Sequence, residues 1–219
     1  MKTNTFLYCM ASIVTLLLLY GLLLGEDADT IIKKAQARYN RITSFEANFT
    51  QLNLWTELES RKTTRGKIYV LEPNRLLLDY SLPTGQFLLC DGDYIYLYSP
   101  SNKQVVKFNV TRLDYNLRFK DLIYKYPQES DVSSDGKETI SSVQCHKLTL
   151  IPREGKADFV KLEIWIGVSD LLIHQVAYQD DSDNKIIYTF SNITVNPGFG
   201  ASRFVFRKPS GAKIIDKSE

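Results

Sequence analysis

Short apolar segments separated by turn residues make up most of the chain from Ser44 onward. Residues 86–105 show this pattern most clearly, because Phe87–Leu89 leads into Asp91-Gly92, a strong hairpin signal, and Tyr94–Tyr98 follows. The segment Tyr94–Tyr98 carries no charge, so a strand there is either covered on both faces or exposes an apolar face. Covering a large apolar sheet is therefore the main structural problem that this sequence poses.

Strand-like segments continue through the rest of the chain. A polar stretch at Glu57–Thr64 is followed by a strand pattern at Gly66–Leu71, and further strand patterns begin at Glu138–Ser142 and run on to Val195. The last strand pattern covers Phe204–Arg207. Turn residues separate these segments at intervals of about ten residues, which predicts an antiparallel meander of about eleven strands.

One amphipathic helix precedes the strands. Asp27 or Asp29 is placed to cap it, and the pattern continues to about Ile42. Its apolar positions repeat at three- and four-residue spacing and form one stripe that packs on the core. The stripe consists of Ile31, Ile32, Ala35, Tyr39 and Ile42.

Helical spacing returns between Val110 and Tyr126, where the strand rhythm stops. Its apolar positions are Leu113, Leu117, Phe119, Leu122, Ile123 and Tyr126. We expect one or two short helices here, ending before Pro127 because proline disfavours a helical residue in front of it.

So few helices do not cover both faces of so large a sheet. We therefore predict a mainly β (α+β) fold, in which a curled antiparallel sheet of about eleven strands forms an unclosed half-barrel. The N-terminal helix and the short central helices form a lid across its mouth. The enclosed apolar space would suit lipid chains.

Composition fits one exported domain. The 219 residues are 44% hydrophobic and 24% charged, with a formal net charge of +2 and no basic cluster, which excludes a nucleic-acid-binding surface. Lys2 is the one charge before Glu26, and Phe6–Leu24 is uncharged. Residues 1–25 are thus a signal peptide or an uncleaved N-terminal anchor, and residues 26–219 form the folded domain outside the cytoplasm.

Catalytic chemistry has no support in the sequence. The two histidines, His146 and His174, stand beside strand residues, where surface positions are expected. No nucleophile elbow, metal-ligand spacing, phosphate loop or dinucleotide fingerprint is present. We predict no enzyme activity, no catalytic residue, no metal site and no cofactor.

Cys90 and Cys145 have two interpretations, since both lie in or beside predicted strands. They form a disulfide in an oxidising compartment, or they are two buried small residues.

The chain also resembles a known family. Its segments match, in order and spacing, those of the LolA family of periplasmic carriers of outer-membrane lipoproteins, from the first helix to about Asp216. The matching segments are Ser44–Gln51, Gly66, Glu72-Pro73-Asn74, Tyr80 with Pro83, Asp91-Gly92, Leu97–Pro100 with Gln104-Val105, Leu148–Pro152, and Phe204–Phe206 with Pro209 and Gly211.

The resemblance implies a task as well as a fold. A monomeric carrier in the periplasm would accept the acyl chains of a lipoprotein from an inner-membrane lipoprotein-releasing transporter and pass them to an outer-membrane acceptor. A tethered lipid- or lipoprotein-binding envelope sensor of the same fold is the alternative, and an uncleaved anchor would favour it. The chain departs from the family at Glu72, where the family has an arginine that ties the lid.

Strand alternation and the resemblance together suggest the residues of the lipid site, although alternation does not decide which sheet face is concave. The candidate cavity residues are Phe45, Phe49, Ile68, Val70, Leu76, Leu78, Phe87, Leu89, Tyr96, Leu162, Ile164 and Ile166. The candidate lid residues are Leu113, Leu117, Leu122 and Ile123.

Overall fold

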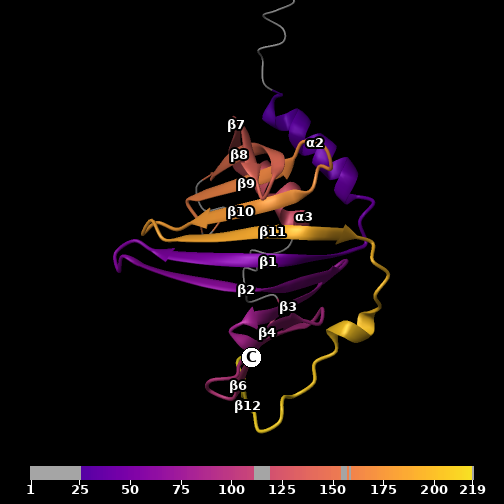
Figure 1. Cartoon of the computed structure of the whole chain (residues 1–219), viewed down its shortest axis with the longest axis vertical. Coiled ribbons are helices and arrows are strands. Elements are labelled where there is room, and N and C mark those ends of the chain that lie inside the picture. Colours follow the sequence, from indigo (N-terminus) through magenta and orange to yellow (C-terminus); the bar gives the residue numbers. More distant parts are fainter. Residues whose placement is uncertain (1–25, 111–118, 154–156, 158, 219) are drawn as a thin grey trace, which may run out of the picture.

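The computed structural model describes residues 26–110, 119–153, 157 and 159–218. Within this part of the chain, twelve strands form one sheet in the order β12-β6-β5-β4-β3-β2-β1-β11-β10-β9-β8-β7 (Figure 1). The strands are β1 (Ser44–Trp55), β2 (Ser60–Leu71), β3 (Arg75–Leu82), β4 (Thr84–Cys90), β5 (Tyr94–Ser99), β6 (Gln104–Asn109), β7 (Ser130–Ile140), β8 (Val143–Pro152), β9 (Lys161–Gly167), β10 (Ile173–Gln179), β11 (Lys185–Val195) and β12 (Lys213–Asp216).

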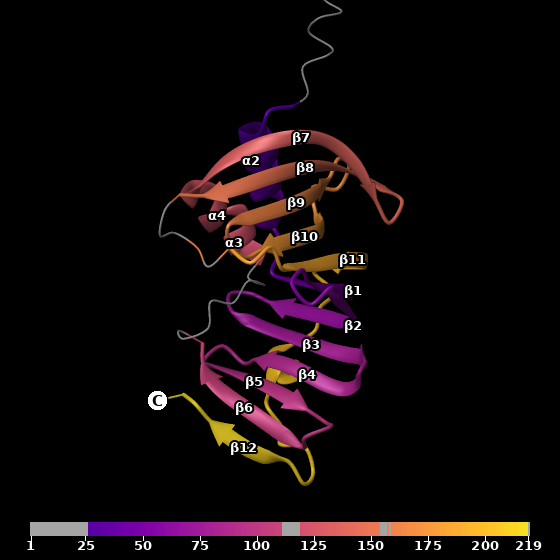
Figure 2. The same ribbon diagram turned by 90° about the vertical axis from the view of Figure 1, so that its left-hand side faces the viewer.

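The sheet is curled and open, with β12 and β7 at its two edges (Figure 2). One buried cluster takes apolar residues from strands far apart in the sheet, such as Ile68 of β2, Leu78 of β3, Leu148 of β8 and Ile164 of β9. Those side chains meet because curvature brings the concave face around on itself. The predicted mainly β, unclosed half-barrel is therefore confirmed, with twelve strands.

Three helices pack on the concave side. They are α2 (Ala28–Tyr39), α3 (Phe119–Ile123) and α4 (Lys125–Glu129). Asp27 caps α2, because its carboxylate accepts the Thr30 backbone N–H at 2.8 Å. At the other end, the buried Tyr39 hydroxyl accepts the backbone N–H of Ile173 at 3.0 Å. This contact fixes α2 to the start of β10.

The prediction that helical structure ends before Pro127 is wrong. Pro127 lies inside α4, at its third residue. The first N–H groups of a helix have no partner within the helix, so a proline in the first turn costs no hydrogen bond.

Two strands extend beyond the predicted boundaries. β2 begins at Ser60, inside the predicted polar stretch, and pairs with β1 as far as Ser60 opposite Trp55. β7 begins at Ser130, eight residues before the predicted start at Glu138. Most side chains in these extensions are exposed, so hydrogen bonding to the neighbouring strand, rather than burial, defines them.

The C-terminal segment covers the outer face of β2–β6, and the predicted strand at Phe204–Arg207 is wrong. This segment forms the short 3₁₀ helix η1 (Ala201–Phe204) and then irregular chain before β12, which pairs parallel with β6. Its aromatic rings pack on the sheet: Phe206 stacks on Tyr96 with ring centroids 4.0 Å apart, and Phe199 meets Tyr69 edge-on at 5.8 Å. The apolar residues at 204–207 are therefore explained by packing on the sheet and not by hydrogen bonding to a neighbouring strand.

Gly66 permits a close approach of β2 and β3. A Cβ at Gly66 would lie 2.1 Å from the carbonyl oxygen of Asp79, and the β2–β3 register shifts between Arg65 and Gly66. Glycine is thus required by the bulge that bends the sheet here.

Among the described residues, no helix combines the length and the apolar composition needed to cross a bilayer. The signal or anchor predicted for residues 1–25 lies outside those residues and stays a prediction.

Candidate functional site

The concave face is filled on one half and partly open on the other. On the filled half, Phe119 of α3 packs between Phe45 of β1 and Phe190 of β11, with ring centroids at 4.4 and 5.2 Å. Leu122 and Ile123 of α3 are fully buried beside them. These contacts hold the central helices against the sheet and leave the face of β4–β6 uncovered by described helices.

The open half carries a band of half-buried apolar side chains on β4, β5 and β6 and just after β6, which we call the concave strip. It consists of Leu88, Leu97, Val106, Phe108 and Val110. Cross-strand pairing puts Leu97 opposite Val106 and, on β3 and β4, Leu78 opposite Leu88. Together these side chains make a continuous apolar surface at the open side of the half-barrel.

Two cavities adjoin the concave strip. One, of about 280 Å³, is bordered by Leu88, Leu97 and Val106 with Tyr80, and no charged residue borders it. The other, of about 350 Å³, lies between α3 and the ends of β2–β4 and is bordered by apolar Leu76, Cys90 and Phe119. Both volumes are near the lower end of the range for ligand sites, about 300–1,000 Å³.

Charge gathers at the second cavity. Glu72, Arg75, Lys120 and Asp121 all border it. Lys120 of α3 forms an ion pair with Glu72 at the end of β2, with Nζ 3.1 Å from Oε2. The open half is therefore neutral at one cavity and charged at the other, which suits a ligand with an apolar tail and a polar end. Burial also raises the pKa of Tyr80 to about 12, so its hydroxyl stays neutral.

Nine of the predicted cavity residues belong to the core cluster of the concave face. They are Phe45, Phe49, Ile68, Val70, Leu76, Leu78, Leu162, Ile164 and Ile166. Of these, Val70 and Leu76 border the charged cavity. The predicted lid residues Leu122 and Ile123 lie on α3, while Leu113 and Leu117 lie outside the described residues.

The structure corrects the placement of Phe87, Leu89 and Tyr96. They belong to a second cluster on the outer face, beneath the C-terminal segment. Phe87, next to the irregularity in β4, also borders the neutral cavity. The residues of β4 and β5 that pack on the concave core cluster are instead Leu88 and Leu97, which the candidate list did not include. Both faces of β4 and β5 carry apolar side chains that pack on a core cluster, so the sequence pattern carries no signal for the choice.

Cys90 and Cys145 are not joined in a disulfide, so the structure supports the interpretation of two buried small residues. Cys90 belongs to the concave core cluster, whereas Cys145 belongs to a third cluster with Trp165 and Ala177. Six strands separate β4 from β8 in the sheet order. Burial raises the pKa of the Cys145 thiol to about 11.

Both histidines are buried, which corrects their expected surface position. Their exposed fractions are 4% for His146 and 6% for His174. His174 Nε2 lies 3.0 Å from Asp170 Oδ2, and burial lowers the pKa of His146 even though Glu26 is nearby. Within the described part of the chain, no group of histidine, cysteine or acidic residues is gathered as metal ligands.

Comparisons with known proteins agree with this architecture. The family model described as outer membrane lipoprotein carrier protein LolA matches residues 40–207. The chain is 24% identical over 184 residues to an outer-membrane lipoprotein carrier protein of Chromohalobacter salexigens, covering 84% of this chain and 85% of the relative. It is 24% identical over 204 residues to one of Klebsiella pneumoniae, covering 93% and 97%.

A solved structure also shares the fold. An uncharacterized conserved protein of Thermus thermophilus superposes with a TM-score of 0.56 at 14% identity, covering 84% of this chain and 98% of that one.

Proposed function

The chain belongs to the LolA family of outer membrane lipoprotein carrier proteins, and from this premise we propose that it carries lipoproteins by their acyl chains. The concave strip and its two cavities would hold part of each chain, and the protein would act as a binding protein rather than an enzyme. In the proposed task it accepts the lipoprotein from an inner-membrane transporter and releases it to an outer-membrane acceptor across the periplasm.

The observation that carries this proposal is the apolar face of β4–β6, which the described helices leave uncovered and where half-buried Leu88 and Leu97 border the neutral cavity. Hiding about 10 methylenes at about 0.8 kcal/mol each contributes about 8 kcal/mol, near micromolar affinity before the costs of ordering. A shallow site that buries only part of the acyl chains suits a carrier, because full burial of several chains would prevent release.

The test is direct. The protein is purified, extracted for bound lipid and titrated with a fluorescent fatty-acid probe that a lipoprotein acyl chain displaces. We expect saturable binding near micromolar affinity and stoichiometric displacement. Folded protein that shows neither bound lipid nor saturable probe binding would reject the proposal.

The Glu72–Lys120 ion pair should slow release from the charged cavity. Lys120 is on α3, and Glu72 directly follows β2, at the position where the family resemblance gives an arginine. The pair therefore joins the helix to the end of the strand. We expect Lys120→Gln to raise the rate of probe release about two- to fivefold, the effect of a partly exposed pair worth about 0.4–1 kcal/mol. Stopped-flow displacement measures the rate.

The charge reversal Glu72→Lys with Lys120→Glu should restore slow release, because it rebuilds an ion pair with the opposite orientation. Lys62→Gln, on an exposed part of β2, is the matched control and should leave the rate unchanged. Equal release rates in Lys120→Gln and Lys62→Gln would show that the pair does not control the cavity.

A further inference from the structure

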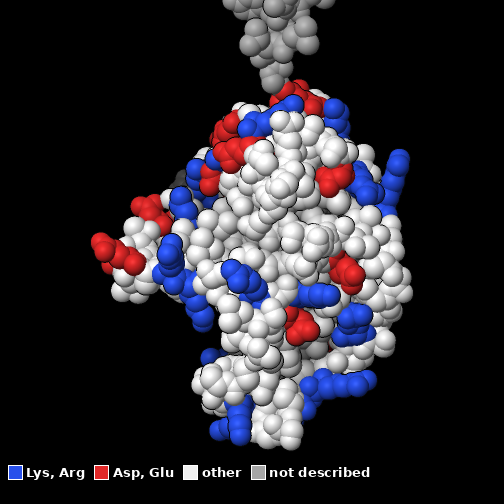
Figure 3. Space-filling view, in the orientation of Figure 1, with Lys and Arg blue, Asp and Glu red and all other residues white. Residues whose placement is uncertain are grey.

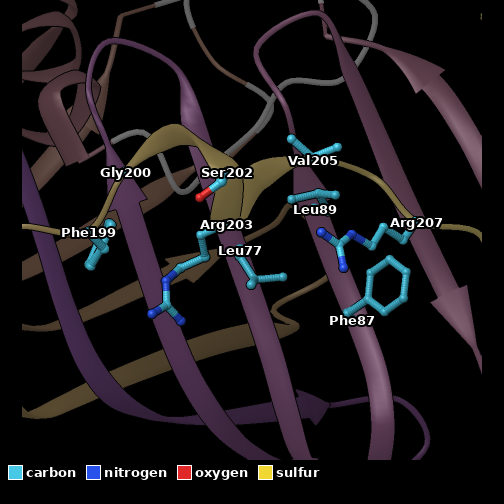
Figure 4. A pocket seen from close by; sticks show the side chains of 9 residues that line it. All are labelled: Leu77, Phe87, Leu89, Phe199, Gly200, Ser202, Arg203, Val205 and Arg207. Carbon is cyan, nitrogen blue, oxygen red and sulfur yellow. The ribbon is translucent and has the colours of Figure 1, made fainter.

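A third cavity, which we call the outer-face pocket, lies on the opposite side of the sheet from the concave strip. It has a volume of about 540 Å³ and is formed between the outer face of β3–β4 and the C-terminal segment (Figure 4). Its lining consists of Leu77, Phe87, Leu89, Phe199, Gly200, Ser202, Arg203, Val205 and Arg207. The sheet supplies an apolar floor, and the C-terminal segment supplies the polar groups.

Two arginines and no acidic residue border this pocket. Figure 4 shows Arg203 and Arg207 on the C-terminal segment, with Leu77 between them in this view. Within the part of the chain that the structure describes, no carboxylate lies within ion-pair distance of either guanidinium, and no side-chain hydrogen bond is made by either one. Two positive charges are thus available to a ligand.

Arg203 is held in position by aromatic rings. Its guanidinium carbon lies 4.2 Å from the ring centre of Tyr69 and 5.2 Å from that of Phe199. A cation–π contact uses no hydrogen-bond acceptor, so the N–H groups of the guanidinium remain able to donate to an anion. Stacking also reduces the freedom that binding would otherwise remove.

The surroundings strengthen the positive field. Lys208 follows Arg207 directly in the sequence, and Lys and Arg side chains gather over the lower part of this face, where the C-terminal segment crosses (Figure 3). Val205 is 59% exposed between the two arginines. The exposed valine and the apolar floor thus lie beside two exposed guanidinium groups, and this combination matches a molecule with both an alkyl chain and a negative charge.

We propose that the outer-face pocket binds an anionic amphiphile, with its phosphate or carboxylate at the rim that carries Arg203 and Arg207 and its first methylenes on Leu77 and Leu89. Guanidinium groups recognise such oxyanions by paired N–H donors. The ligand chemistry is shared by the head group of an anionic lipid and by a free alkyl phosphate. This site is separate from the concave strip, so each can fail without the other.

The exported protein is titrated with dodecyl phosphate below its micelle concentration, by calorimetry and by amide chemical shifts. We expect one binding event with shifts at Leu77, Leu89 and residues 199–207. The double variant Arg203→Gln with Arg207→Gln should bind about 100-fold more weakly, about tenfold for each charge-assisted contact. Arg203→Lys with Arg207→Lys should bind about tenfold more weakly, because lysine keeps the positive charge but lacks the paired N–H donors of the guanidinium group.

Matched controls separate this site from its neighbours. Lys208→Gln removes an adjacent charge that does not border the pocket and should leave the affinity within about twofold. Vesicles of anionic lipid that produce the same shifts identify a lipid head group as the source, and dodecyl phosphate alone producing them identifies a free amphiphile.

Three results would overturn the proposal. The first is amide chemical-shift changes that are confined to the concave strip. The second is an unchanged affinity for dodecyl phosphate in an arginine-to-glutamine double variant that still unfolds cooperatively, and the third is an equal affinity for inorganic phosphate, which lacks the alkyl chain.

Discussion

Phe119→Ala is expected to lower the free energy of unfolding by about 3–5 kcal/mol and to release α3 from the sheet. Phe119 is 4% exposed and contacts Phe45 edge-on at 4.4 Å and Phe190 at 5.2 Å, so its ring joins the helix to β1 and β11. It also borders the charged cavity. Removing the ring therefore leaves a void in the core and widens the cavity under α3.

Denaturant unfolding measures the loss, and hydrogen exchange locates it. Amides of α3 and α4 should exchange faster in Phe119→Ala than amides of β9 and β10, because a five-residue helix has little stability without its packing. Phe119→Leu, which keeps most of the volume, should cost less than about 1.5 kcal/mol. Leu58→Ala, at a residue 74% exposed, should change stability by less than about 0.5 kcal/mol. Unaltered protection of α3 in Phe119→Ala would show that other contacts hold the helix.

The sequence predicts the curled sheet because its turn residues and apolar segments recur at strand spacing. It predicts α2 because Asp27 and the stripe from Ile31 to Tyr39 agree on one helix. The sequence does not predict the exposed parts of β2 and β7, because their side chains face solvent. Strand pairing there involves only the backbone, so these segments show no alternation of apolar and polar residues.

The faces of β4 and β5 depend on one irregularity that the pattern does not reveal. At the β3–β4 turn Ser81 pairs with Thr84, and an uninterrupted ladder from that pair would place Leu78 opposite Phe87. The register shifts by one residue between Asp79 and Ser81, so Leu78 pairs with Leu88 instead. A shift of one residue exchanges the two faces of every following position, which moves Leu89 outward.

The same shift creates both candidate sites. On the concave side it presents Leu88, and through the β4–β5 pairing of Leu88 with Leu97 it sets the concave strip. On the outer side it presents Phe87 and Leu89, which become the floor of the arginine pocket. The C-terminal segment covers this second apolar face with Phe199, Phe204 and Phe206. The apolar side chains of β4 and β5 therefore border one cavity on the concave side and another on the outer side of the sheet.

Leu88→Asp is expected to weaken acyl-probe binding about 100-fold. Leu88 is half-buried at the centre of the concave strip and borders the neutral cavity, whose lining has no charge. An aspartate there would have to lose water to let methylenes lie against it, and desolvation of a carboxylate without a partner costs several kcal/mol. Fluorescence titration of the probe measures the affinity, and denaturant unfolding checks that the variant is folded.

The control is Leu82→Asp, the same substitution at a residue that is 49% exposed at the end of β3 and borders neither cavity. It should leave probe affinity within about twofold. Dodecyl phosphate binding at the outer-face pocket should persist in Leu88→Asp, because Leu88 points to the other side of the sheet from Leu89. Equal probe affinities for Leu88→Asp and Leu82→Asp, with both proteins folded, would place the acyl chains somewhere other than the concave strip.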